Sequence, residues 1–411
     1  MKNLIITMIV GTMLSTTIFA QLQNYRPLDK SGLNMFETPK NTGVKFDGLK
    51  VKVGGNFAQQ FQMLSHENGN VGDTLFGIAP GFNLATANLV VDVQLNDGIA
   101  LKLDTYLSSR NHSETWVKGG YVQIDKLPFG LDGIMKYSTI KVGHMEINYG
   151  DQHFRRTDNG NAFYNPFVGN LILDAFATEI GGEYYFKHPS GFMAMVGLTN
   201  GEIKGNTQDS EDRGFAVLAK VAYDKQLNDD LRFRLSASMY NANTTRITLY
   251  GGDRTGSRYY NVLVKPDGTG DFRTGRLTAD LNNETTAIQI NPFLKWKGLE
   301  LFGVYEIISG KKSSEDADRE FNQMAIDLLY RFGENEDFYL GGRYNKAGGT
   351  FAGKDYEISA TRMQFAAGWF VTDNLMLKVE YVDQSWDGYP EGDILYEGKF
   401  DGAVIEAAVS F

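Results

Sequence analysis

The chain has 411 residues, with 46 glycines, 9 prolines, no cysteine and a formal net charge of −10. The lack of cysteine excludes disulfide frameworks, thiolate metal sites, cysteine nucleophiles and lipid attachment at a cysteine, and the acidic balance argues against broad nucleic-acid binding. A negative mean hydropathy argues against the repeated apolar runs of about 20 residues that helical membrane proteins need. Abundant glycine and aromatic residues with little proline favour an all-β chain.

A secretory signal peptide is predicted over residues 1–20. Lys2 supplies the positive charge, Leu4–Met13 supply the apolar core, and a run of small and polar residues ends at Ala20. A membrane anchor is the alternative, but the apolar run is short and the residues from Gln21 onward are polar. We therefore expect an exported protein of a bacterial envelope. Residues 21–48 look irregular and are expected to form a periplasmic segment near or inside the domain that follows.

Alternation with a period of two begins at Leu49 and continues to the last residue. In Leu231–Tyr240 the odd positions are apolar and the even positions are charged, hydroxylic or phenolic. A strand places these two sets on opposite faces, whereas a helix would scatter them around its circumference. About sixteen such runs, of the length expected for membrane-spanning strands, cover residues 49–63, 84–96, 98–110, 115–126, 138–149, 175–187, 192–200, 213–224, 231–243, 284–296, 299–310, 321–333, 337–346, 360–371, 375–387 and 399–411.

The connections between these runs alternate between short and long. Short ones such as 96–98 and 297–298 carry hairpin-turn residues, whereas 150–174 and 244–283 are long. Transmembrane barrels have short periplasmic turns on one rim and long external loops on the other. A soluble β-sandwich is the alternative, but the apolar faces are long and nearly free of charge, and aromatic residues gather near the run ends. The sequence therefore predicts a transmembrane antiparallel β-barrel of about sixteen strands over residues 49–411.

The last strand, Ile405–Phe411, ends on an aromatic residue. This ending, after a signal peptide and without cysteine, resembles the outer-membrane porins of Gram-negative bacteria, of the general or phosphate-selective type. The resemblance implies an outer-membrane location, contact with outer-membrane lipid, and passive diffusion of small hydrophilic solutes through a water-filled channel. It also implies that the barrel-assembly machinery reads the strand ending at Phe411, and that the protein forms a homotrimer. No cofactor, metal or catalytic residue is expected.

Inward-facing charges of the barrel wall are expected to decide which solutes pass. Assigning faces by alternation gives more inward cations than inward anions, which predicts a mild anion preference; the alternative is that these charges simply pair across the wall. The inward cations singled out are Lys102, Lys220, Arg232, Arg234, Arg331, Arg343, Arg362 and Lys378.

The connection 150–174 is the candidate constriction loop. The third external loop of porins commonly folds into the barrel, and this connection follows the fifth predicted strand. Its charged residues are positioned to set a field across the channel, while an exposed loop with weak ion pairs is the alternative. The longer connection 244–283 is expected to be a solvated loop; the alternative is that it caps the pore or contacts a neighbouring subunit. The candidate constriction residues are Asp151, His153, Arg155, Arg156 and Asp158.

Two other classes of function stay open at this point. Outer-membrane phospholipases and proteases are also barrels, although the five histidines lie far apart and no nucleophile or metal-binding motif is present. A secreted β-sandwich that binds a ligand is the second alternative.

Overall fold

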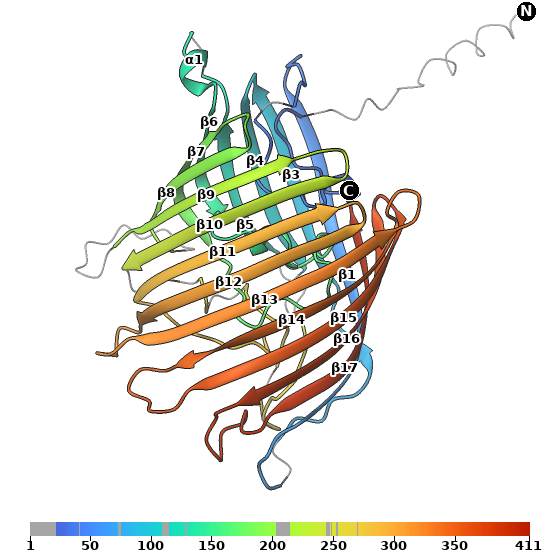
Figure 1. Cartoon of the computed structure of the whole chain (residues 1–411), viewed down its shortest axis with the longest axis vertical. Helices are drawn as coiled ribbons and strands as arrows, with labels where there is room; N and C mark the ends of the chain where they lie inside the picture. The colour runs from blue at the N-terminus through green and yellow to red at the C-terminus, as the bar shows by residue number, and fades with distance from the viewer. Residues whose placement is uncertain are drawn as a thin grey trace, which may run out of the picture.

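Among the residues that the structure describes, sixteen strands form a closed antiparallel barrel, together with one additional two-residue strand (Figure 1). This confirms the predicted fold class. The computed structural model describes residues 22–40, 42–72, 75–108, 115–127, 130–202, 214–243, 247, 249–251, 254–268 and 270–411. The predicted signal peptide lies outside these residues.

The strand bounds match the predicted runs to within a few residues. Strands one to nine are β1 (Lys50–Glu67), β2 (Gly81–Phe82), β3 (Thr86–Asn96), β4 (Ile99–Ser108), β5 (Trp116–Ile124), β6 (Ser138–Glu146), β7 (Thr178–Lys187), β8 (Phe192–Thr199) and β9 (Ala216–Gln226). The remaining strands are β10 (Leu231–Asn243), β11 (Glu284–Trp296), β12 (Leu299–Lys311), β13 (Arg319–Phe332), β14 (Phe338–Thr350), β15 (Ile358–Thr372), β16 (Leu375–Asp387) and β17 (Lys399–Ser410).

The barrel closes through β1, which pairs with both β3 and β17. Its first half runs antiparallel to β3, from Lys50 opposite Gln94 to Ala58 opposite Thr86. Its second half pairs with β17, ending with Glu67 opposite Lys399. Two further backbone hydrogen bonds, each 3.1 Å between nitrogen and oxygen, join Phe411 to Gly55. The closure leaves no free sheet edge among the described strands, as a barrel in a bilayer requires.

Strict alternation of exposure shows which face meets the membrane. Along β13, Met324, Ile326, Leu328 and Tyr330 are exposed, while the residues between them are buried inside the barrel. An apolar exterior around a polar interior is the arrangement of a lipid-embedded barrel and the reverse of a soluble one. Stacked aromatic rings near one rim, including those of Phe338 and Trp369 at 5.9 Å, add an interfacial girdle.

The two rims differ as the alternation of connection lengths predicts, with one exception. Short turns at 297–298 and 373–374 share a rim with the C-terminus, and the long connections 147–177 and 244–283 leave the opposite rim. The connection between β5 and β6 belongs to the short rim but is long, and it contains the helical turn α1 (Asp132–Met135). The alternation is therefore not strict. No helix among the described residues is long and apolar enough to span a membrane.

Three non-strand segments occupy the barrel interior. They are the N-terminal residues 22–40, the connection 147–177, and the described residues of 247–283. Their apolar residues join inward wall residues in three buried clusters, represented by Tyr259 beside Phe400, Phe163 beside Phe370 and Phe36 beside Phe293. The space enclosed by the strands is thus largely filled by the chain itself.

Candidate functional site

The connection 147–177 crosses the interior of the barrel from one wall to the other. Near its start lies Gly150, whose φ of +68° suits glycine and where a Cβ atom would collide with the side chain of Gln289. A 3₁₀ turn (Gln152–Phe154) follows. The backbone N–H groups of Val168 and Ile172 then donate to Glu380 at 2.8 Å and to Asn345 at 2.7 Å, both on the far wall. The predicted constriction residues therefore lie inside the barrel.

Asp151 fixes the start of this connection to the wall. Its carboxylate is fully buried and lies 2.8 Å from both Lys220 Nζ and Arg234 Nη2, and it accepts a hydrogen bond from Ser236 at 2.7 Å. Burial by itself raises the pKa of Asp151, but Arg234 and Lys220 outweigh it and lower the pKa to about 2. The carboxylate is therefore ionised throughout the neutral range.

The two adjacent arginines point to different partners. Arg155 Nη2 donates to Glu300 of β12 at 2.6 Å. Arg156 binds Asp174, at the other end of the same connection, with Nη2 at 2.5 Å and Nε at 2.7 Å. Burial opposes the charge on Arg156, but Asp174 raises its pKa above the usual value. The bidentate pair closes the connection on itself, so neither arginine is a free charge facing solvent.

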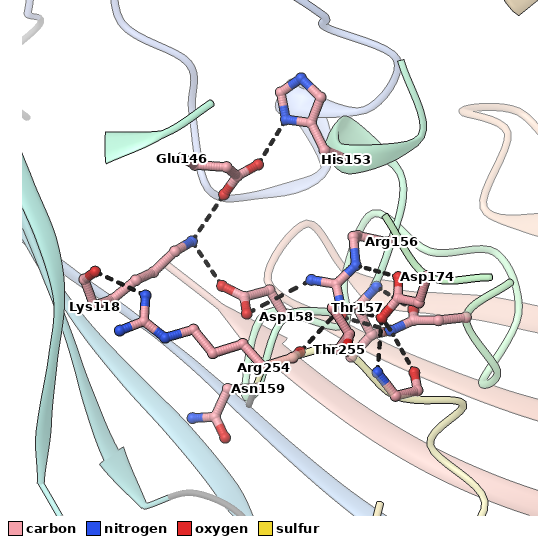
Figure 2. A network of polar contacts seen from close by, with 12 residues as sticks. Lys118, Glu146, His153, Arg156, Thr157, Asp158, Asn159, Asp174, Arg254 and Thr255 are labelled. Carbon is pink, nitrogen blue, oxygen red and sulfur yellow. Dashed lines mark hydrogen bonds and ion pairs between the residues drawn. The ribbon is translucent and has the colours of Figure 1, made fainter. Parts of the chain in front are cut away.

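A branched polar network surrounds Lys118 of β5 (Figure 2). Lys118 Nζ lies 2.6 Å from Asp158, 3.0 Å from Glu146 and 3.6 Å from Asp104. His153 contacts the other oxygen of Glu146 at 2.6 Å, and burial lowers the pKa of this histidine. One ammonium thus holds three carboxylates, which ties the connection to β4, β5 and β6.

Lys378 of β16 holds the middle of the connection against the opposite wall. Its Nζ donates to the carbonyls of Ala162, Asn165 and Phe167 at 2.9–3.0 Å, and it pairs with Glu406 at 2.7 Å. Three carbonyls and one carboxylate around one buried ammonium satisfy all its donors. This lysine is part of the scaffold of the inner loop.

The eight wall cations all face the interior, but most of them are neutralised there. Six lie within 4.0 Å of a carboxylate: Lys220 and Arg234 beside Asp151, Arg232 beside Asp224, Arg331 beside Glu300, Arg343 beside Asp327, and Lys378 beside Glu406. Arg362 donates instead to Gln384 at 2.5 Å and to the carbonyl of Gly275 at 2.8 Å. Lys102 makes no ion pair or hydrogen bond with any residue that the structure describes, and it lines an open cavity.

The N-terminal segment enters the barrel from the rim of short turns. Glu37 lies 2.9 Å from Arg234 and 3.1 Å from Lys220, and these cations hold its pKa well below the usual range despite burial. Arg26 donates to the carbonyl of Phe154 at 3.1 Å and stacks over the ring of Tyr164. The segment therefore packs directly on the inner connection and shares its ion cluster.

The connection between β10 and β11 was expected to be solvated, and for most of its described residues this expectation is wrong, although 265–267 are exposed. Tyr259 is fully buried and donates its hydroxyl to Glu380 at 2.6 Å, and Tyr260 exchanges two hydrogen bonds with Gln62. Leu277 N–H donates to the carbonyl of Ile172 at 3.0 Å, which joins this connection to 147–177. The sequence contained one sign of this burial. Two adjacent tyrosines follow Arg258 in a loop that is otherwise polar.

A cavity of about 190 Å³ lies inside the barrel on the side of β3 to β7. The N-terminal segment covers it on one side and the connection 147–177 on another. The charged and aromatic residues around it include Tyr25, Asp92, Lys102, Lys118, Tyr121 and Lys141. The cavity volume exceeds by far the roughly 10–15 Å³ that a single water needs, so polar solutes have room here.

No family model and no curated protein sequence matches the chain. Solved structures with the same fold include an anion-selective porin from Comamonas acidovorans, which is 14% identical with a TM-score of 0.54 over 88% of this chain and 100% of that one. The outer membrane channel DcaP of Acinetobacter baumannii is 12% identical, with a TM-score of 0.53 over 90% and 99% of the two chains. OprB of Pseudomonas putida is 11% identical, with a TM-score of 0.54 over 89% and 94%.

These similarities concern the fold, which is that of outer-membrane porins, and agree with the resemblance found in the sequence. Each comparison covers most of this chain and nearly all of the neighbour, so the barrel has the same overall extent as its structural neighbours. At this level of identity the fold alone is shared, and the roles of individual side chains depend on this chain's own contacts.

Proposed function

We propose that the protein is a passive, non-catalytic channel of the bacterial outer membrane for small hydrophilic solutes. The observation that carries the proposal is the combination of an apolar, lipid-facing exterior with an interior wall of charged and amide side chains, crossed by the inward connection 147–177. The anion-selective porin and the DcaP channel share this fold, which supports the proposal without identifying the solute.

The route for solutes is proposed to run along β3 to β7. On the opposite side, the connections 147–177 and 247–283 pack against β13 to β17 and fill the interior with buried aromatic and aliphatic residues. The cavity of about 190 Å³ faces the other half of the wall. The N-terminal segment narrows this route, so the channel is expected to pass only small solutes and a small ionic current.

A weak ion preference follows from how the wall charges are paired. A mild preference for anions stays the prediction, but it has to come from Lys102 and its surroundings, because six of the eight wall cations already have a carboxylate within 4.0 Å. A reversal potential in a KCl gradient measures this directly. Clear cation selectivity would overturn the anion preference.

The assembly partners are proposals of the same kind. Phe411 is 56% exposed although its backbone pairs with β1, and we propose that the barrel-assembly machinery recognises it. OmpT of Vibrio cholerae, 13% identical with a TM-score of 0.53 over 89% of this chain and 100% of that one, has a trimer form. We propose a homotrimer here, with lipid around its outer wall.

Liposome swelling with uncharged solutes of increasing size tests the channel. Vesicles containing the full mature chain should swell in a small polyol and swell more slowly as solute size grows, while protein-free vesicles should not. Deleting residues 22–40 should raise the size limit, because this segment covers the cavity. Swelling equal to that of protein-free vesicles for every solute would refute the proposal.

A further inference from the structure

Unpaired charges of both signs line the cavity beside β3 to β6. Asp92 is 8% exposed, and its carboxylate accepts no hydrogen bond from the described residues and has no cation within 4.0 Å among them. The ammonium groups of Lys102 and Lys141 likewise make no hydrogen bond or ion pair within the described part of the chain. Lys141 lies only over the rings of Tyr121 and Tyr185, each 5.2 Å away.

Strand register places these charges close together on one wall. Asp92 of β3 is directly opposite Lys102 of β4, and Lys102 is opposite Tyr121 of β5. Lys141 of β6 is opposite Gln123, two residues along β5 from Tyr121. Among the described wall residues of these four neighbouring strands, one carboxylate and two ammonium groups without an ion pair therefore face the cavity, with a tyrosine between the two lysines.

The N-terminal segment supplies a cover for this part of the wall. Tyr25 lines the same cavity, and its hydroxyl is a buried atom without a hydrogen-bond partner among the described residues. A buried hydroxyl without a partner costs free energy unless something in the cavity satisfies it. Like the three wall charges, Tyr25 is poised to bind a polar solute.

Two other cations of the cavity are arranged differently. Lys118 lies within 4.0 Å of three carboxylates, and Arg156 forms a bidentate pair with Asp174. These two cations are paired with carboxylates of the protein and hold the inner connection in place. Lys118 and Arg156 therefore belong to a structural network, whereas Asp92, Lys102 and Lys141 remain available to bind a solute.

We propose that this wall is a binding subsite for small zwitterions, with free α-amino acids as the chemical class. The carboxylate of the solute binds between Lys102 and Lys141, and its ammonium group binds Asp92, with the Tyr25 hydroxyl as a further polar contact. A solute with both charges satisfies both signs of unpaired group, whereas a simple anion or cation leaves one of them buried and unpaired. This inference rests on the proposed channel function.

Single-channel recording with matched solutes tests the subsite. The full mature chain is placed in planar bilayers with KCl, and brief blocks of the current are measured with L-alanine, with lactate, which lacks the ammonium group, and with L-alaninamide, which lacks the carboxylate. L-alanine should block at a concentration about tenfold lower than either singly charged analogue, which corresponds to about 1.4 kcal/mol.

Two variants assign the contacts. Asp92→Asn should weaken the block by L-alanine to the level of lactate, and Lys102→Gln should weaken it to the level of L-alaninamide. Lys225→Gln, which removes an exposed charge at the end of β9, should change nothing. Persistent KCl conductance shows that a variant has folded, and the comparison of the three solutes on the unaltered protein decides the question if a variant does not conduct.

The outcomes separate this inference from the function on which it rests. KCl steps with equal block by L-alanine, lactate and L-alaninamide would overturn the zwitterion subsite and leave the channel intact. A preference for L-alanine that survives Asp92→Asn and Lys102→Gln would also overturn the assigned subsite. The absence of KCl steps would refute the channel itself, and the subsite with it. A tenfold preference that each variant removes supports the proposal.

Discussion

Replacing Asp151 by asparagine is expected to loosen the inner connection and to do so in a pH-dependent way. The carboxylate lies 2.8 Å from Lys220 and Arg234, which lower its pKa from 3.8 to about 2. A pKa lowered by this amount means that ionised Asp151 stabilises the folded state by about 2 kcal/mol. Glu37 stays beside both cations in the variant, so the loss should fall below the 3–5 kcal/mol typical of broken buried pairs.

The sign of the pH effect follows from the lowered pKa. Because the folded-state pKa is below the unfolded value, the contribution is fully present above about pH 4 and is lost as the pH falls through 3.8 toward about 2. The Asp151→Asn variant should therefore be less stable than the original protein by about 2 kcal/mol at pH 7. At about pH 2 the difference should have shrunk, because Asp151 is then partly protonated in the original protein as well.

Urea unfolding in detergent micelles, followed by tryptophan fluorescence, measures both quantities. Asp229→Asn is the matched control, because Asp229 is exposed in the turn between β9 and β10 and should show no difference at either pH. A stability difference for Asp151→Asn that is absent at pH 7, or that is unchanged between pH 7 and pH 2, would refute the assignment of Asp151 as the charged anchor.

The remaining predictions concern the loop, its far anchor and the C-terminus. Lys378→Gln leaves three carbonyls and Glu406 without their common donor, so the urea midpoint should fall by an amount equivalent to about 3 kcal/mol; an unchanged midpoint would contradict the anchoring role. Exchanging Arg155 and Arg156 for glutamate places like charges against Glu300 and Asp174 and should alter conductance or ion preference in bilayer recordings; no change in either would count against the constriction. Removing Phe411 should lower the yield of membrane-assembled barrel in cell fractions, and an undiminished yield would reject its role in assembly.

The strands could be predicted because the two environments on either side of the barrel wall require alternating apolar and polar residues. Lipid outside and polar groups inside require alternation at every position, so the expected runs 231–243, 284–296 and 375–387 coincide with β10, β11 and β16. The inward orientation of the wall cations followed from the same alternation. The helical turn in connection 125–137 was harder to predict, because a connection at the rim of short turns is not required to alternate in polarity.

The contents of the barrel were less predictable, because they depend on partners far away in the chain. Alternation indicates that Lys102 and Arg343 face inward, but only the folded barrel pairs Arg343 with Asp327 and leaves Lys102 unpaired. Similarly, Tyr259 is buried by Glu380, more than a hundred residues away. The polar composition of 244–283 predicted exposure to solvent. The inner wall of the barrel is itself polar, however, so a polar loop packs against it as favourably as it contacts water.

Single-channel recording of the full mature chain in planar bilayers tests the central claim most directly. The account predicts discrete KCl conductance steps that are small, because residues 22–40 and 147–177 fill much of the barrel, and that grow when residues 22–40 are deleted. Bilayers that contain correctly folded protein but show no steps, with or without residues 22–40, would contradict it.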